Sequence, residues 1–283
     1  MTTARVTERI AYGLLILATV VVIAPLAVVV ATLVARGWPA ISWEFLTTAP
    51  RNGMREGGIF PAIVGTAILS IGTVLVALPL GVLTAVYLHE YARGRRFTAV
   101  IRLAILNLAG VPSIVHGLFG LGVFVILCGF GSSIVAGCLT LAILTLPVVI
   151  VASEEALRAV PDALREASLA LGATRFQTVF RVVLPNAVPG VLTGAILGLG
   201  RAAGETAPIL FTVAAFYLPS LPRSPLDQVM ALPYHLYVIS TQVPNMPEDR
   251  AYGTALVLLG MGIVANGAAS VIRSRMRRRS HHG

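Results

Sequence analysis

Long runs without charged side chains fill most of the sequence, and short arginine-rich segments separate them. A bilayer core about 30 Å thick needs about 20 apolar residues for one helical crossing. On this measure the runs predict six transmembrane helices, at about residues 10–35, 60–88, 103–127, 133–153, 188–211 and 251–272. The first run is longer than the apolar region of a signal peptide, so we expect it to remain as a helix. Gly129–Ser133 supplies the turn between the third and fourth spans.

The composition agrees with an integral membrane protein. Of the 283 residues, 57% are hydrophobic and 12% are charged, whereas soluble domains carry about 25% charged residues. All 21 basic residues are arginine, and the absence of lysine excludes a P-loop ATPase or Schiff-base chemistry in this chain. Cys128 and Cys138 both lie in apolar stretches, so neither a disulfide scaffold nor a cysteine-built metal site is expected.

The distribution of arginine predicts the orientation. With the N terminus inside, fifteen arginines fall on the cytoplasmic side and five on the outer side, which by the positive-inside rule places both termini in the cytoplasm. The predicted fold class is an all-α, polytopic membrane protein, with residues 1–283 forming a single transmembrane domain. The net charge of +9 is mainly this topology signal, although the basic tail Arg273–Arg279 could also contact anionic membrane lipid.

The connection predicted at residues 154–187 is longer than two helices need, and it carries helix-boundary signals of its own. Pro161 suits a first helical turn, Gly172 can end that helix in a left-handed conformation, and Thr174 starts a capping box with the glutamine three residues later. Leu184–Pro185 predicts the end of the second helix. We expect a cytoplasmic elbow of two short helices with a glycine hinge, whose apolar side chains either pack on this chain or dock onto a partner.

Arg201 and Glu205 are charged residues inside the otherwise apolar fifth span, and their spacing of four residues places them on one face of a helix. A charge at mid-membrane costs about 2.5–3.5 kcal/mol, so it needs a compensating role. One interpretation is a buried ion pair with a structural role alone. The other is a polar path, in which the planar guanidinium of Arg201 suits phosphate oxygens. In the third span Asn107 and Ser113 are candidates for the same path, and His116 is interpreted as a satisfied interior histidine.

The elbow also carries a motif. The segment from Glu166 to Pro185 resembles EAA-x3-G-x9-I-x-L-P, the signature of the membrane subunits of bacterial ATP-binding-cassette (ABC) importers, with Ser168 in place of the second alanine and Val182 in place of the isoleucine. The resemblance implies that the elbow docks into a cleft of a separate ATPase subunit. The candidate residues for this coupling are Glu166, Ala167, Ser168, Gly172, Thr174, Arg175 and Phe176.

Three further stretches resemble the PstA-type permease subunits of bacterial phosphate importers: Gly57–Thr66, Gly110–Val115 and Gly200–Pro208. This resemblance implies a type I ABC importer permease fold in the cytoplasmic, or inner, membrane and the import of inorganic phosphate. It implies a PstC-type permease, two copies of a PstB-type ATPase and a PstS-type binding protein as partners. ATP and magnesium would bind to the ATPase, so this chain would hold no cofactor and would not itself be an enzyme. Arg201 and Glu205 would act in phosphate translocation.

Two other functions fit parts of the pattern. Six spans with an intramembrane arginine–glutamate pair also suit a self-contained secondary carrier, but the elbow and the lack of a visible inverted repeat speak against it. A membrane enzyme would need a catalytic cluster. The outer segments offer scattered residues such as Asp227, Glu248, Asp249 and His235, which we interpret as a solvated outer surface that could contact the binding protein.

Overall fold

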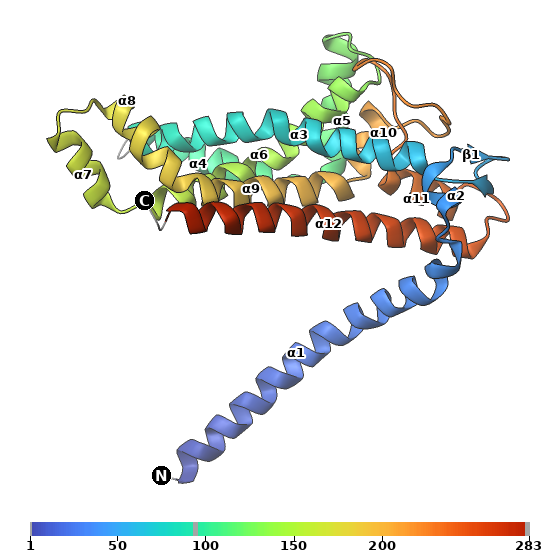
Figure 1. The fold of residues 1–283 in the computed structure, drawn as a ribbon, viewed down its shortest axis with the longest axis horizontal. Helices are drawn as coiled ribbons and strands as arrows, with labels where there is room; N and C mark the ends of the chain where they lie inside the picture. Colours follow the sequence, from blue (N-terminus) through green and yellow to red (C-terminus); the bar gives the residue numbers. More distant parts are fainter. Residues whose placement is uncertain (1, 93–95, 281–283) are drawn as a thin grey trace.

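The chain folds into a bundle of long helices in a computed structural model that describes residues 2–92 and 96–280 (Figure 1). Helices α3, α6, α9 and α12 lie side by side, whereas α1 leaves the bundle at an angle and touches α12 near its own C-terminal end. The long helices are α1 (Thr2–Gly37), α3 (Phe60–Val86), α6 (Ile134–Arg158), α9 (Leu184–Gly204) and α12 (Glu248–Ser280). This arrangement confirms the predicted all-α fold.

Five of the described helical stretches are long and apolar enough to cross a membrane, and a bent pair of helices makes a sixth if it counts as one span. The pair consists of α4 (Arg96–Ala109) and α5 (Ser113–Gly120), which the π-helical turns η3 (Leu121–Leu127) extend. The helix axis bends by 101° between the two halves. The helix breaks at Gly110–Pro112 because proline lacks an N–H donor and disfavours the α conformation of the residue before it. The sequence predicted a crossing here but not the bend.

The second helix of the elbow does not end at Leu184–Pro185, so that prediction is wrong. Helix α8 (Arg175–Thr178), the π-helical turns η4 (Val179–Val183) and α9 form one continuous helix, Arg175–Gly204. In a regular α-helix the proline ring would clash with the carbonyl one turn earlier. The wider turn of η4 ends at Val183, two residues before the proline, and accommodates it. The elbow is therefore joined rigidly to the fifth span.

Small residues let the central helices approach each other closely. A Cβ added at Gly190 on α9 would lie 2.4 Å from the Cβ of Ala156, and one added at Gly81 on α3 would lie 2.7 Å from Val149 Cγ1. Both partners belong to α6. In the most apolar stretch of α6, 61% of the residues are buried, whereas in that of α1 the share is 0%. Close packing of this kind is a main source of attraction between helices in lipid. Helix α6 therefore forms the centre of the bundle.

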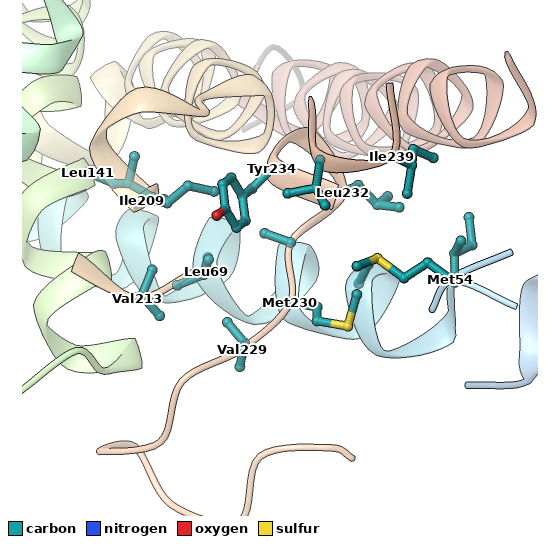
Figure 2. Packing of buried hydrophobic residues seen from close by; sticks show 14 of the residues in the cluster. Met54, Leu69, Leu141, Ile209, Val213, Val229, Met230, Leu232, Tyr234 and Ile239 are labelled. Carbon is teal, nitrogen blue, oxygen red and sulfur yellow. The ribbon is translucent and has the colours of Figure 1, made fainter. Parts of the chain in front are cut away.

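A layer of short elements closes the end of the bundle opposite the elbow, here called the hairpin end (Figure 1). Figure 2 shows Met54, Met230 and Leu232 among its buried side chains. The backbone N–H of Leu232 donates a 2.7 Å hydrogen bond to Thr66 Oγ1 on α3, so α11 folds back against the bundle. Its elements are η1 (Trp38–Ala40), α2 (Trp43–Thr47), the antiparallel strands β1 (Pro50–Arg51) and β2 (Glu56–Gly57), and α11 (Leu232–Thr241).

The interpretation of His235 as an outer-surface residue is wrong. Its side chain lies on α11, is 3% exposed, and has no hydrogen-bond partner for Nδ1 within the described ranges. Glu248 and Asp249 are exposed and Asp227 is partly exposed, as expected for a solvated surface. The difference arises because the packing of α11 against α3 and α12 buries the face that carries the imidazole.

This burial predicts a loss of stability in acid. The pKa of His235 is lowered from 6.5 to about 4 because a charged ring would lose its hydration. The unfolded chain therefore binds a proton below pH 6.5 and the folded chain only below about pH 4, so acidification across this range destabilises the fold by about 3 kcal/mol. We expect the unfolding temperature of the purified chain in detergent to fall between about pH 7 and about pH 5, and to fall less in His235→Leu. Equal losses in both proteins would contradict this assignment.

Candidate transport site and coupling elbow

The charged pair lies where the fifth span breaks. Arg201 occupies the last turn of α9, which ends at Gly204, and Glu205 follows with extended backbone angles of φ −76° and ψ 131°. The prediction that both residues share a helical face is therefore wrong for Glu205. Glycine is a poor helix former, and in a continuous helix the ring of Pro208 would clash with the carbonyl group of Gly204 one turn earlier, so the helix breaks here. The carboxylate still turns back, and Arg201 Nε lies 3.6 Å from Glu205 Oε1.

The pair is loose and accessible. The side chain of Arg201 is 34% exposed and that of Glu205 is 18% exposed. At 3.6 Å their contact is an ion pair without the short geometry of a hydrogen bond. In the part of the chain that the structure describes, the guanidinium of Arg201 makes no hydrogen bond. Arg201 therefore presents several N–H groups that could donate hydrogen bonds to an anion.

The two broken spans meet through their second halves. Helix α10 (Ala207–Thr212) resumes the fifth span beyond the break and packs against α5, where a Cβ added at Gly117 would lie 3.0 Å from the carbonyl oxygen of Ala207. Asn107 is exposed in the last turn of α4 and Ser113 is partly buried at the start of α5, so the two residues flank the 101° bend. No hydrogen bond or ion pair among the described residues joins either of them to the charged pair.

Two polar side chains near these breaks differ from the sequence interpretation. His116 is 5% exposed, with Nδ1 3.3 Å from the carbonyl oxygen of Pro112, but its buried Nε2 lacks a partner in the described segments. The ring is thus satisfied on one side alone. Asn266 on α12 was not predicted: a Cβ added at Gly200 would lie 3.3 Å from its Oδ1, which places this amide beside the turn that carries Arg201. The signal that could have revealed Asn266 is a single amide in an otherwise apolar span.

The elbow follows its local sequence signals up to the proline. Helix α7 (Asp162–Ala170) begins after Pro161, and Gly172 has a left-handed φ of +83°. The predicted capping box is confirmed, because Thr174 Oγ1 accepts a hydrogen bond from the backbone of Gln177 at 3.3 Å and the Gln177 side chain accepts one from the backbone of Thr174 at 2.9 Å. Since residues other than glycine adopt a positive φ only with backbone strain, the hinge needs glycine.

Apolar side chains cover the outer face of the elbow. Leu171 is 90% exposed, Phe176 is 62% exposed and Leu169 is 49% exposed. The predicted coupling residues Glu166, Ala167, Gly172 and Thr174 are exposed as well. Ser168 is different, because its hydroxyl lies 2.9 Å from that of Thr178 and joins the two halves of the elbow. Arg175 is also different, because its guanidinium donates to the backbone oxygen of Glu90 in this chain. An apolar cap surrounded by polar groups is typical of a docking surface for another protein.

The basic tail is partly described. Arg273 donates to Thr193 Oγ1 at 3.1 Å and to Ser270 Oγ at 3.2 Å, so this arginine ties α12 to α9. The side chains of residues 275–279 lie outside the described residues, as do those of Arg5, Arg93 and Arg95, which contributed to the predicted orientation. Lipid contact by the tail therefore stays a prediction.

The sequence matches a known family of membrane proteins. The model of the binding-protein-dependent transport system inner membrane component family matches residues 77–278. This chain therefore belongs to that family and is a multi-pass protein of the inner membrane, consistent with its apolar helices.

Individual relatives refine the comparison. The chain is 39% identical over 265 residues to the phosphate transport system permease protein PstA 1 of Mycobacterium tuberculosis (strain CDC 1551 / Oshkosh), covering 92% of this chain and 86% of that protein. It is 36% identical over 278 residues to the probable ABC transporter permease protein YqgI of Bacillus subtilis, covering 94% of each. Its fold is similar to that in a bacterial ABC transporter involved in the import of the acidic polysaccharide alginate, with a TM-score of 0.63, 17% identity, and coverage of 94% of this chain and 95% of that chain.

Proposed function

We propose that this chain is a membrane-spanning subunit of an ABC importer that carries inorganic phosphate into the cell. The observation that carries the proposal is the Arg201–Glu205 pair, a cationic fork with unengaged donors beside a break in a membrane helix. Planar guanidinium groups bind the oxygens of phosphate in bidentate geometry. The printed name of the PstA 1 relative, a phosphate transport system permease, supports phosphate as the anion.

The pair can exchange partners during transport. An anion in a region of low dielectric constant is costly unless a positive charge stabilises it, and Arg201 supplies that charge. When no anion is present, Glu205 neutralises Arg201 across the 3.6 Å contact. This contact lacks the strength of a short hydrogen bond, so phosphate oxygens can displace the carboxylate as the subunit switches between its outward-open and inward-open states.

The elbow connects this site to the energy source. Its apolar cap docks on a PstB-type ATPase subunit, which binds ATP and magnesium, so this chain supplies the permease function and no ATPase site. The continuous helix from Arg175 to Gly204 reaches about 40 Å from the elbow to the turn that carries Arg201. The complete machine contains a PstC-type permease, two ATPase copies and a PstS-type binding protein. The elbow and both chain termini lie in the cytoplasm, in accord with the distribution of arginine.

Uptake of radiolabelled phosphate tests this function. Cells that lack the chain are complemented with the wild-type gene or an empty vector, and uptake is measured before and after ATP depletion with a proton gradient imposed. We expect phosphate uptake in the cells that carry the wild-type gene and none with the empty vector, and we expect ATP depletion to abolish this uptake. Uptake that survives ATP depletion would replace the importer with a secondary carrier, and equal uptake with the empty vector would contradict phosphate transport.

A further inference from the structure

A buried ionic cluster fastens the elbow to the end of α3. Arg165 on α7 has a side chain that is 10% exposed, and Glu90, in the π-helical turns η2 (Tyr87–Tyr91) that extend α3, has one that is 7% exposed. Arg165 Nε and a terminal nitrogen donate to Glu90 Oε1 at 3.2 Å and 3.0 Å. These two residues are 75 positions apart in the sequence, so folding alone brings them together.

The Arg165 guanidinium also donates hydrogen bonds to other segments of this joint. It donates to the carbonyl oxygen of Val160 at 2.7 Å, to Asp162 Oδ1 at 3.0 Å and to the carbonyl oxygen of Leu157 at 2.8 Å. Leu157 belongs to the last turn of α6, and Asp162 begins α7. One guanidinium therefore links the ends of α3 and α6 to the first half of the elbow.

Glu90 also holds the second half of the elbow. Its backbone carbonyl oxygen accepts a hydrogen bond from Arg175, whose guanidinium carbon lies 5.3 Å from the centre of the Tyr91 ring. Carbonyl groups at a helix C-terminus lack partners within the helix, and cationic side chains there satisfy them and match the helix dipole. His89 Nδ1 lies 2.9 Å from Glu90 Oε1, so that oxygen is in contact with three nitrogen atoms.

The ionic cluster fixes the orientation of the elbow more strictly than apolar packing alone would. Leu88, Leu157, Val179 and Val183 already form a buried apolar core at the same joint. Apolar packing tolerates changes in register, whereas a desolvated guanidinium leaves a buried charge unpaired when its partner moves. Among the described residues, Glu90 alone accepts hydrogen bonds from both Arg165 of α7 and Arg175 of α8.

We propose that Glu90 is a positioning residue that holds both halves of the elbow to α3, so that a displacement of the docked elbow moves α3 and the helix carrying Arg201 as one body. This inference rests on the proposed function for its meaning in transport. Its geometric content, a fixed distance between the elbow and α3, is independent of which substrate is carried.

The test compares Glu90→Gln with Glu155→Gln, a control at an exposed glutamate near the end of α6. Each variant is assembled with its permease partner, ATPase and binding protein in vesicles, and phosphate uptake and ATP hydrolysis are measured together. We expect Glu90→Gln to retain ATPase subunits at the wild-type ratio but to lower the uptake per ATP hydrolysed about tenfold. Because Arg165 makes the same contact and further bonds at this joint, Arg165→Gln should give at least the same loss, and the double variant should be no worse than Arg165→Gln alone.

A second readout does not depend on phosphate. Spin labels at Ala163→Cys on α7 and Leu83→Cys on α3, in a chain with Cys128 and Cys138 replaced by serine, report the distance between elbow and helix. We expect one narrow distance that is the same with and without ATP, and a broadened distribution after Glu90→Gln. Three results for Glu90→Gln would each overturn the inference. They are a normal uptake per ATP hydrolysed, a loss of assembly in proportion to the loss of both activities, and a distance distribution that does not change. Absence of phosphate uptake by the wild type, with the distance result as expected, would instead contradict the proposed function.

Discussion

Arg201→Gln is expected to reduce phosphate uptake by a factor of about 100 or more, while the chain still assembles and its ATPase partner still hydrolyses ATP. The substitution removes the guanidinium at the break between α9 and α10. Hydrogen bonds to charged groups contribute about 1.5–3 kcal/mol each, so the loss of two such bonds to the anion accounts for the expected factor. Radiolabelled uptake at matched membrane levels of the chain is the measurement.

Companion variants separate transport from structure at this pair. Arg201→Lys should retain an intermediate rate, because it keeps the charge and loses the planar fork. Glu205→Gln should slow uptake about tenfold, because Arg201 then has no carboxylate to displace a bound anion. Arg223→Gln, at an exposed arginine in the segment between α10 and α11, is the matched control and should leave uptake unchanged. A wild-type rate for Arg201→Gln would make the pair purely structural, and unchanged transport in Glu205→Gln would contradict the exchange of partners.

The second large effect is expected at the hinge of the elbow. Gly172→Asp should abolish phosphate uptake and lower the amount of ATPase subunit that copurifies with the complex by about tenfold or more. A side chain at φ +83° costs about 1–2 kcal/mol, and the new carboxylate would stand beside Leu171 in the apolar cap. Nothing lies within 4 Å of the added Cβ, so the effect arises from backbone strain and surface charge rather than a steric clash.

Gly53→Asp is the matched control for the hinge. Gly53 has a φ of +62° and open space around its Cβ position, but it lies between β1 and β2 at the hairpin end, remote from the elbow. It should therefore carry a similar local strain while the ATPase subunit copurifies at the wild-type ratio. If both variants lost the ATPase subunit equally, the elbow would have no special part in docking, and normal uptake with Gly172→Asp would remove it from the coupling mechanism.

The sequence by itself determined the features that depend on residues close together in the chain. The hydrophobic runs indicated the membrane helices because the thickness of a bilayer sets the length of each run. The hinge at Gly172 and the capping box at Thr174 were predictable because each depends on a few neighbouring residues. The elbow motif and the PstA-like stretches indicated the family, which the comparisons then showed.

The tertiary structure decided the features that depend on what packs beside each segment. The turns of η4 accommodate Pro185, so a residue that ordinarily ends a helix lies inside a continuous one. His235 is buried because α11 folds back against the bundle, although its segment resembles a polar outer loop. Glu90 appeared in the sequence as the charge that ends the second hydrophobic run, and only the fold places it against Arg165. Hydrophobic length and capping are local, whereas burial and ion pairing are set by neighbours distant in the chain, which a one-dimensional pattern does not specify.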